Sequence, residues 1–222
     1  MLYPKIETLY VRDKDTFTVT SELRLPEFGL VKHWHVTEKV DGTNVIVTYR
    51  PSAFDDHSVR FNGRNGSSEL PGPLKAFMEK NVTLDALDRL FDADGREVTL
   101  FGEGYGPGIQ KGGGDYRSDV SFRLFDVNVG NEFCPGLWLN WDSVSDIAQK
   151  LGVETVPVLS TVASLGEVTQ LVHTFSRTAV EDGGKGLTHE GVVARTDPYL
   201  LTRYGTRLMF KLKGSDYRAG KR

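Results

Sequence analysis

The chain has 222 residues, of which 39% are apolar and 26% charged, with a net charge of −3 and a pI of about 6.0. A chain of this size can bury a full hydrophobic core, as expected of one soluble globular domain. A protein that coats DNA non-specifically is usually basic, because phosphate contacts supply most of that affinity. Any nucleic-acid contact is therefore expected from a local basic patch.

The cysteine content and the apolar runs exclude further classes. Cys134 is the only cysteine, which excludes an internal disulfide and a cysteine zinc cluster. The first fifteen residues are charged and lack the long apolar run of a secretory signal. No segment approaches the roughly 20 apolar residues of a membrane span. We expect a monomer in a reducing cytoplasm, without membrane contact.

The first half of the chain combines strands with one helical region. Alternating or short apolar runs predict strands at Val31–Thr37, Val45–Tyr49 and Val59–Phe61. Helical spacing covers Pro73–Phe91, with a break near residues 81–83 that divides it into two pieces.

The second half is richer in strands. Strands are predicted at Val98–Phe101, Phe122–Val127, Val156–Leu159, Val192–Ala194 and Arg207–Leu212. Helices are predicted at Ser143–Leu151, closed by Gly152, and at Val168–Phe175. Strands dominate without a regular alternation with helices. This favours an α+β fold with largely antiparallel sheets flanked by helices.

Glycine and proline cluster in Gly102–Gly114. Such a stretch is typical of a flexible surface loop, and it also occurs where the backbone approaches a ligand closely. The stretch lacks the glycine-lysine-serine or -threonine pattern of a phosphate-binding P-loop. The sequence therefore excludes P-loop nucleotide binding.

The strongest local signal is the sequence TEKVDGTN at residues 37–44. Lys39 is predicted at the end of a strand, just before a turn, where its side chain can project into a cleft. Taken alone, Lys-x-Asp-Gly is a weak signal, and Asp-Gly is equally typical of a β-hairpin turn. The segment becomes informative only in combination with motifs located later in the chain.

An ordered series of short motifs lies C-terminal to Lys39. The segments are Gly63–Gly66, Phe101–Gly104, Phe122–Asp126, Glu190–Val193 and Lys211–Lys213. With TEKVDGTN, this series resembles the motifs of the covalent nucleotidyltransferase superfamily, which comprises DNA ligases, RNA ligases and mRNA capping enzymes. The resemblance runs from the first residues to Tyr217 and implies the ATP-grasp-like nucleotidyltransferase domain of ligases.

Two segments look most like phage-type RNA ligases. These are KVDGTN and the sequence GIQKG at residues 108–112, which is followed by Tyr116. Some RNA ligases of that group have histidine in place of Asp41. If the chain is phage-encoded, the host cytoplasm is its expected location.

The resemblance implies that Lys39 is the nucleophile. An attacking amine must be neutral, and for a lysine with the reference pKa of about 10.4 this costs roughly 4 kcal/mol near pH 7.5. Nearby cations lower the pKa of a lysine and so reduce that cost, which is a role that Lys211 and Lys213 can fill. Their spacing places both on one face of a strand. By resemblance they hold the α-phosphate, although an amphipathic strand with solvated lysines is the alternative. Lys111 is more typical of a solvated loop residue.

Carboxylates supply the next set of roles. By resemblance, Glu103 contacts the ribose and Glu190 helps to hold a divalent metal ion, Mg²⁺ or Mn²⁺. Such ions accept a few carboxylate and phosphate oxygens plus water. Asp41 is a candidate for a water-bridged contact to the metal, but turn formation also explains it. For Glu103 and Glu190, the alternative is that each is an ordinary solvated glutamate.

The remaining roles concern the nucleotide. Phe125 resembles the aromatic residue that stacks on the purine, although Phe122 can fill that role and both can instead belong to the core. Asn44 is expected to donate to a phosphate. Glu38 is expected to read the base edge through its backbone or its side chain.

Two groups are candidates for contacting the polynucleotide. Arg64 resembles the motif arginine near the ribose and the acceptor 5′-phosphate, for which its planar donor fork is suited. The basic C-terminal segment contributes Arg218, Lys221 and Arg222, for which simple solvation is the alternative. His33, His35 and His189 are interpreted as structural or surface residues, because the family chemistry needs none of them.

The resemblance predicts an ATP-dependent polynucleotide ligase, most similar to RNA ligases. Its partner is expected to be RNA, an RNA–DNA hybrid or a nicked duplex. Only nine residues follow Lys213, so residues 1–222 are expected to form one nucleotidyltransferase domain without a C-terminal OB-fold domain. A minimal DNA ligase and a non-catalytic nucleic-acid-binding relative of this fold are the alternatives.

Overall fold

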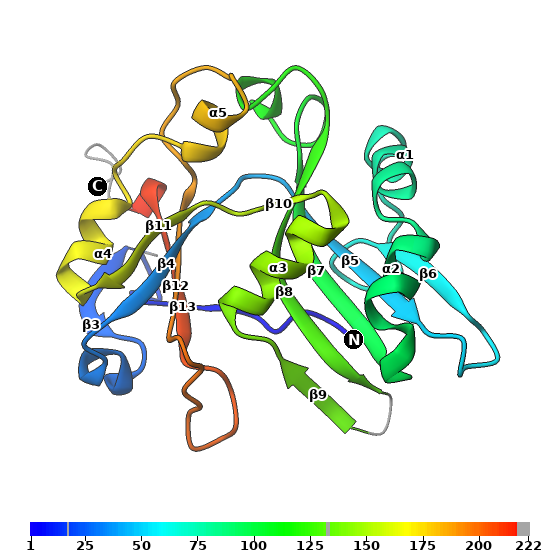
Figure 1. Cartoon of the computed structure of the whole chain (residues 1–222). Helices are drawn as coiled ribbons and strands as arrows, with labels where there is room; N and C mark the ends of the chain where they lie inside the picture. The colour runs from blue at the N-terminus through cyan, green and yellow to red at the C-terminus, as the bar shows by residue number, and fades with distance from the viewer. Residues whose placement is uncertain (17, 132–133, 217–222) are drawn as a thin grey trace. The chain divides into compact units, whose positions relative to one another are not determined.

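The computed structural model describes residues 1–16, 18–131 and 134–216, which form two compact units (Figure 1). The first unit comprises Met1–Pro4 and Asp41–Thr155. The second comprises Lys5–Val40 and the chain from Val156 onward. The chain passes from the second unit into the first between Val40 and Asp41. The expectation of one domain over the whole chain stays a prediction.

The first unit is built on one mixed sheet with the strand order β10-β8-β7-β5-β6, and β9 also pairs with β8. Only the β8–β10 pairing is parallel. The strands are β5 (Thr43–Arg50), β6 (Ser58–Asn62), β7 (Glu97–Tyr105), β8 (Ser121–Asn131), β9 (Cys134–Trp138) and β10 (Glu154–Thr155).

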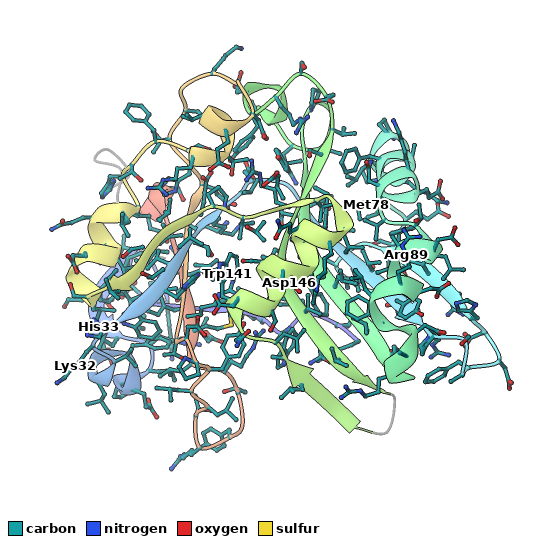
Figure 2. All side chains as sticks on the ribbon, in the orientation of Figure 1. Lys32, His33, Met78, Arg89, Trp141 and Asp146 are labelled. Carbon is teal, nitrogen blue, oxygen red and sulfur yellow. The ribbon has the colours of Figure 1, made fainter. Side chains whose placement is uncertain are left out.

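Three α-helices accompany this sheet, namely α1 (Gly72–Asn81), α2 (Leu84–Phe91) and α3 (Trp141–Leu151). Short 3-10 turns lie at Asp92–Asp94 and Gly113–Asp115. Met78 of α1 and Trp141 of α3 are buried, whereas Arg89 of α2 and Asp146 of α3 are exposed (Figure 2). This two-sided pattern fixes which face of each helix packs inward.

The predicted break in the helical region is confirmed. Thr83 lies in an extended conformation, and its side chain accepts a hydrogen bond from the backbone N–H of Ala86, so it caps α2. The predicted end of α3 is confirmed as well. Gly152 adopts a left-handed conformation with φ of 68°, which glycine adopts at little cost.

The second unit contains a sheet with the strand order β1-β13-β12-β4-β11, in which only β1 and β13 are parallel. These strands are β1 (Glu7–Thr8), β4 (Trp34–Lys39), β11 (Val158–Ala163), β12 (Gly191–Arg195) and β13 (Met209–Lys213). A separate pair joins β2 (Tyr10–Arg12) and β3 (Val19–Leu23). The helices are α4 (Leu165–Leu171) and α5 (Arg177–Glu181), with 3-10 turns at Pro26–Leu30 and Gly214–Asp216.

The core of the second unit is centred on Phe210. Its ring lies 4.7 Å from Trp34 and 5.0 Å from Phe28, measured between ring centroids. Val36 and Leu212 belong to the same buried cluster. Because side chains alternate along a strand, the even-numbered positions of β4 and β13 face this core, and the odd-numbered positions face the other way.

The α+β class with mostly antiparallel sheets is confirmed, whereas one alternative is excluded and one helix was predicted with the wrong bounds. The Asp41-Gly42 segment does not form a hairpin turn, because β4 and β5 belong to different sheets. The helix predicted at Val168–Phe175 is α4, which begins at Leu165. Ser164 and Glu167 form a reciprocal capping box that fixes the earlier start.

Other strand boundaries shifted, and some elements had no clear pattern. The first long strand begins at Trp34 and reaches Lys39. The strands β1 to β3 and the helix α5 were not predicted, since each is five residues or shorter. Among the described residues, no helix has both the length and the apolar character needed to cross a membrane.

Candidate functional site

The predicted nucleophile lies at the end of a strand in the second unit, level with two neighbouring strand ends. Lys39, the last residue of β4, is opposite Gly191 of β12, and Gly191 is opposite Lys213 of β13. A Cβ atom on Gly191 would lie 2.0 Å from the backbone oxygen of Leu212. Only glycine therefore fits between these strands at this point.

Three lysines share one face of this sheet. Lys211 and Lys213 are two residues apart on β13, so both point away from the core, as the spacing predicts. Lys39 occupies the equivalent face of β4, because the alternate residues Trp34 and Val36 point into the core. We call Lys39, Lys211, Lys213 and the adjoining Glu190 the lysine cluster.

Glu190 links two of these lysines. One carboxylate oxygen lies 2.7 Å from Lys213 Nζ, and the other accepts a hydrogen bond from Lys39 Nζ. Burial raises the pKa of the Glu190 carboxyl, but the charges and hydrogen bonds of Lys39 and Lys213 outweigh it and hold the pKa below its ordinary value. The cluster therefore combines a carboxylate with closely spaced cations on one sheet face.

Glu38 points to the opposite face of β4 and is buried. One carboxylate oxygen accepts a hydrogen bond from the Ser176 hydroxyl at 2.6 Å, and the other accepts from the backbone N–H of Thr178 at 3.0 Å. Ser176 also caps α5 by accepting from the backbone N–H of Ala179. Reading a base with this side chain would require its release from α5, whereas a backbone contact would not. Both roles stay predictions.

Replacing Ser176 with alanine is expected to destabilise the protein by about 2–3 kcal/mol, because the change removes a helix cap and one donor to a buried carboxylate. The measurement is the free energy of unfolding in urea, compared with wild type.

The matched control is Ser164→Ala. Ser164 caps α4 but bonds to the exposed Glu167, so its loss should cost only about 1 kcal/mol. Equal costs for the two changes would show that the Glu38 contact contributes nothing beyond ordinary capping.

Asp41–Asn44, the part of TEKVDGTN that follows Val40, belongs to the first unit. The backbone N–H of Asp41 donates to the Tyr116 hydroxyl at 3.2 Å, and Gln110 Nε2 donates to the backbone oxygen of Gly42 at 3.1 Å. A Cβ atom on Gly42 would lie 2.2 Å from the backbone oxygen of Gly104. The segment GIQKG and Tyr116 therefore brace the turn after Val40. The sequence resemblance singled out both, but their shared target was not predicted.

Asn44, Glu103 and Arg123 lie opposite one another on β5, β7 and β8. Residues directly opposite in a sheet share a face. The side-chain oxygen of Asn44 is buried and has no hydrogen-bond partner within residues 1–16, 18–131 and 134–216. Such an atom is uncommon in a folded protein unless a ligand or water completes it. Arg123 is buried and donates to the Tyr105 hydroxyl and to the Thr155 backbone oxygen, each at 3.0 Å.

The two phenylalanines proposed for purine stacking differ in their surroundings. The register of β7 and β8 shifts between Phe101 and Gly102, which leaves Phe125 as the extra residue of a β-bulge. Phe125 is half-buried and makes an edge contact with Tyr3, with centroids 5.1 Å apart. Phe122 is buried against Gly102, where an added Cβ would lie 2.1 Å from its ring. Phe125 is thus the more accessible candidate.

The remaining residues considered in the sequence analysis differ in their exposure. Arg64 is exposed in the turn Gly63–Gly66, and Lys111 is exposed in its loop. His33 precedes β4 at the end opposite Lys39 and is exposed (Figure 2). His189 is buried, and its Nε2 lies 2.9 Å from the Leu171 backbone oxygen.

His35 is buried within β4. Arg218, Lys221 and Arg222 lie outside the described residues, so their contact with nucleic acid stays a prediction.

Comparisons with known proteins place the chain in a family. A protein-family model described as RNA ligase matches residues 32–213. No curated protein matches the chain in sequence.

The fold is similar to three solved structures of Naegleria gruberi RNA ligase. A mutant with AMP and Mn is 20% identical, with a TM-score of 0.61, over 96% of this chain and 62% of that one. A mutant with ATP and Mn is 19% identical, with a TM-score of 0.63, over 98% and 61%. The ligase with PPi is 20% identical, with a TM-score of 0.62, over 97% and 62%.

The chain thus spans about three fifths of the length of those Naegleria chains. At this identity, the likeness to the solved structures shows the nucleotidyltransferase fold, whereas the family match extends over most of the chain and includes every motif from Lys39 to Lys213. The chain therefore belongs to the RNA ligase family.

Proposed function

We propose that this chain is an ATP-dependent RNA ligase that joins a 3′-hydroxyl to a 5′-phosphate through a lysyl-AMP intermediate. The observation that carries the proposal is the lysine cluster, in which Lys39 shares a sheet face with Lys211 and Lys213 and contacts Glu190. Such an enzyme would repair breaks in RNA, and we place it in the cytoplasm.

The proposed reaction has three displacements at phosphorus. The Lys39 amine attacks the α-phosphorus of ATP, forming a phosphoramidate bond to AMP and releasing pyrophosphate. A 5′-phosphate oxygen of the polynucleotide then attacks the same phosphorus, taking AMP and freeing Lys39. Finally, the 3′-hydroxyl attacks the polynucleotide 5′-phosphorus, seals the strand and releases AMP. Each step depends mainly on positioning and on stabilising negative charge.

Lys211 and Lys213 are assigned to the α-phosphate, since two ammonium groups on the face of Lys39 can offset the charge that develops there. Glu190 has the donor chemistry for Mg²⁺ or Mn²⁺, which accept a carboxylate oxygen together with phosphate oxygens and water. Because both of its oxygens contact lysines, metal binding there would displace at least one ammonium group. The metal ion would supply positive charge to the phosphates.

The nucleotide roles rest on the first unit and on Glu38. Asn44 is assigned to a phosphate, to which its amide nitrogen would donate; its unpartnered buried oxygen can only accept, so a water or a ribose hydroxyl would complete it. Glu103 is assigned to the ribose, Phe125 to the purine face and Glu38 to the base edge. Further roles are assigned to Asp41, through water on the metal, and to Arg64, at the acceptor phosphate.

The test measures joining directly. Purified protein with Mg²⁺ and ATP should join an RNA 3′-hydroxyl to an RNA 5′-phosphate, and labelling by α-³²P-ATP should exceed labelling by α-³²P-GTP. We expect at least about a tenfold preference for ATP, which corresponds to roughly 1.4 kcal/mol. The comparisons support ATP as donor, because solved Naegleria RNA ligase mutants contain ATP or AMP with Mn.

Each contrary result has a defined meaning. Preferential sealing of DNA nicks with DNA ends would identify a minimal DNA ligase. Labelling by GTP in preference to ATP would point to a capping-type nucleotidyltransferase. Polynucleotide binding without any protein–AMP adduct would identify a non-catalytic relative.

A further inference from the structure

The segment between β12 and β13 forms an ordered hairpin. The backbone N–H of Leu208 donates to Leu200, and that of Thr202 donates to Thr206. Gly205 closes the tip with a hydrogen bond to the Thr202 oxygen and a φ of 76°. Figure 1 shows this Leu200–Leu208 hairpin as an orange-red arm that extends past the ends of the two strands. Its backbone is therefore organised without a ligand.

The surface of this hairpin is unusual in composition. Tyr204 is 75% exposed, and Leu200 and Leu201 are 51% and 61% exposed. The Arg203 guanidinium lies 4.6 Å from the centre of the Tyr204 ring, and the Arg207 guanidinium lies 4.9 Å from that of Tyr199. Residues 199–207 contain two arginines and no acidic residue, in a chain whose net charge is −3.

This combination fits one class of partner. An exposed aromatic ring offers a face on which an unpaired base can stack, and arginine pairs with phosphate through its planar donor fork. A positively charged arm in an acidic chain selects a polyanion by charge complementarity. We propose that the Leu200–Leu208 hairpin binds a single-stranded segment of the polynucleotide substrate, with Tyr204 stacking on a base and Arg203 contacting the backbone.

The distance between the hairpin and Lys39 determines which part of the polynucleotide the hairpin contacts. Gly191, opposite Lys39, begins β12, and Arg195 ends it on the hairpin side. The four residue steps from Gly191 to Arg195 span about 14 Å, at about 3.4 Å per residue. A polynucleotide with stacked bases advances about 3.4 Å per nucleotide. For a stacked polynucleotide that follows β12, the contact therefore lies at least about four nucleotides from the reacting end. The inference rests on the proposed ligase function and specifies how its substrate is held.

The experiment compares short and long strands. Tyr204→Ala and Arg203→Ala should each raise the KM for sealing a 5′-adenylylated RNA of about 12 nucleotides roughly tenfold, about 1.4 kcal/mol. Neither should change sealing of a strand of about three nucleotides, which is too short to reach the hairpin. Tyr204→Phe keeps the stacking surface and loses the hydroxyl that accepts a hydrogen bond from Arg203, so its KM should lie much nearer to wild type than that of Tyr204→Ala. In filter binding, the affinity for the longer RNA should fall in Tyr204→Ala and Arg203→Ala and should stay near the wild-type value in Tyr204→Phe.

The charge control is Arg60→Ala in the first unit, which removes another exposed arginine, one that pairs with Asp56, and should leave the KM for the longer RNA unchanged. The proposal would be overturned if the hairpin variants raised the KM equally for short and long RNA, or if they did not raise it at all. In the second case, the exposed residues of the hairpin would be candidates for binding a protein instead. If wild type takes no AMP from ATP, the ligase proposal fails, while filter binding still decides whether the hairpin grips RNA.

Discussion

Lys39→Ala is expected to abolish formation of the protein–AMP adduct, with a loss of at least about 10³-fold, because no other group replaces a missing covalent nucleophile efficiently. Wild-type protein incubated with ATP and Mg²⁺ should gain the mass of one AMP. The adduct should be labile in acid and sensitive to hydroxylamine, as a phosphoramidate is. Intact-protein mass spectrometry measures both properties.

Two further variants separate nucleophilicity from charge. Lys39→Arg keeps a cation at the end of β4, but the guanidinium does not lose its proton in proteins, so this variant should also form no adduct. Lys32→Ala removes the same charge before the other end of β4, where the side chain is exposed (Figure 2), and should be labelled like wild type. An adduct that persists in Lys39→Ala would show that the nucleophile lies elsewhere.

Glu190→Gln is expected to slow adduct formation about 10²-fold, which corresponds to roughly 2.7 kcal/mol. The change keeps the shape of the side chain but removes the negative charge that contacts Lys39 and Lys213. It also removes the carboxylate assigned to the metal ion. Rates of labelling by α-³²P-ATP across a range of Mg²⁺ concentrations measure the effect. A wild-type rate in this variant would remove Glu190 from the proposed chemistry.

The pH dependence of stability gives an independent check on the same contact. The pKa of Glu190 lies below its ordinary value of 4.5 because of Lys39 and Lys213. A carboxyl with a lowered pKa in the folded state stabilises it above pH 4.5, and this stabilisation is lost as pH falls through the folded-state pKa. The stability advantage of wild type over Glu190→Gln should therefore shrink as the pH falls from 6 to 3. The urea midpoints of unfolding of both proteins, measured at each pH, test this expectation. A difference in stability between them that does not change with pH would contradict the ion pairing.

Several features of this protein can be derived from sequence alone, because they depend on neighbours in the chain. The break between α1 and α2 results from a local cap at Thr83. The shared face of Lys211 and Lys213 results from the two-residue period of a strand. Lys39 was placed at a strand end before a turn, where the structure has it. The family was recognisable because the motif residues keep their order and residue types along the chain.

The tertiary structure decided the contacts that join distant parts of the chain. Lys39 and Glu190 are 151 residues apart, and Glu38 and Ser176 are 138 apart. No local pattern specifies such pairs, because strand order and register bring them together. Pairing of β4 with β12 rather than with β5 excluded the alternative of a β-hairpin at Asp41-Gly42. Strand alternation then sent Lys39 to one face and Glu38 to the other, where α5, too short to give a clear periodic signal, supplies the buried partners of Glu38.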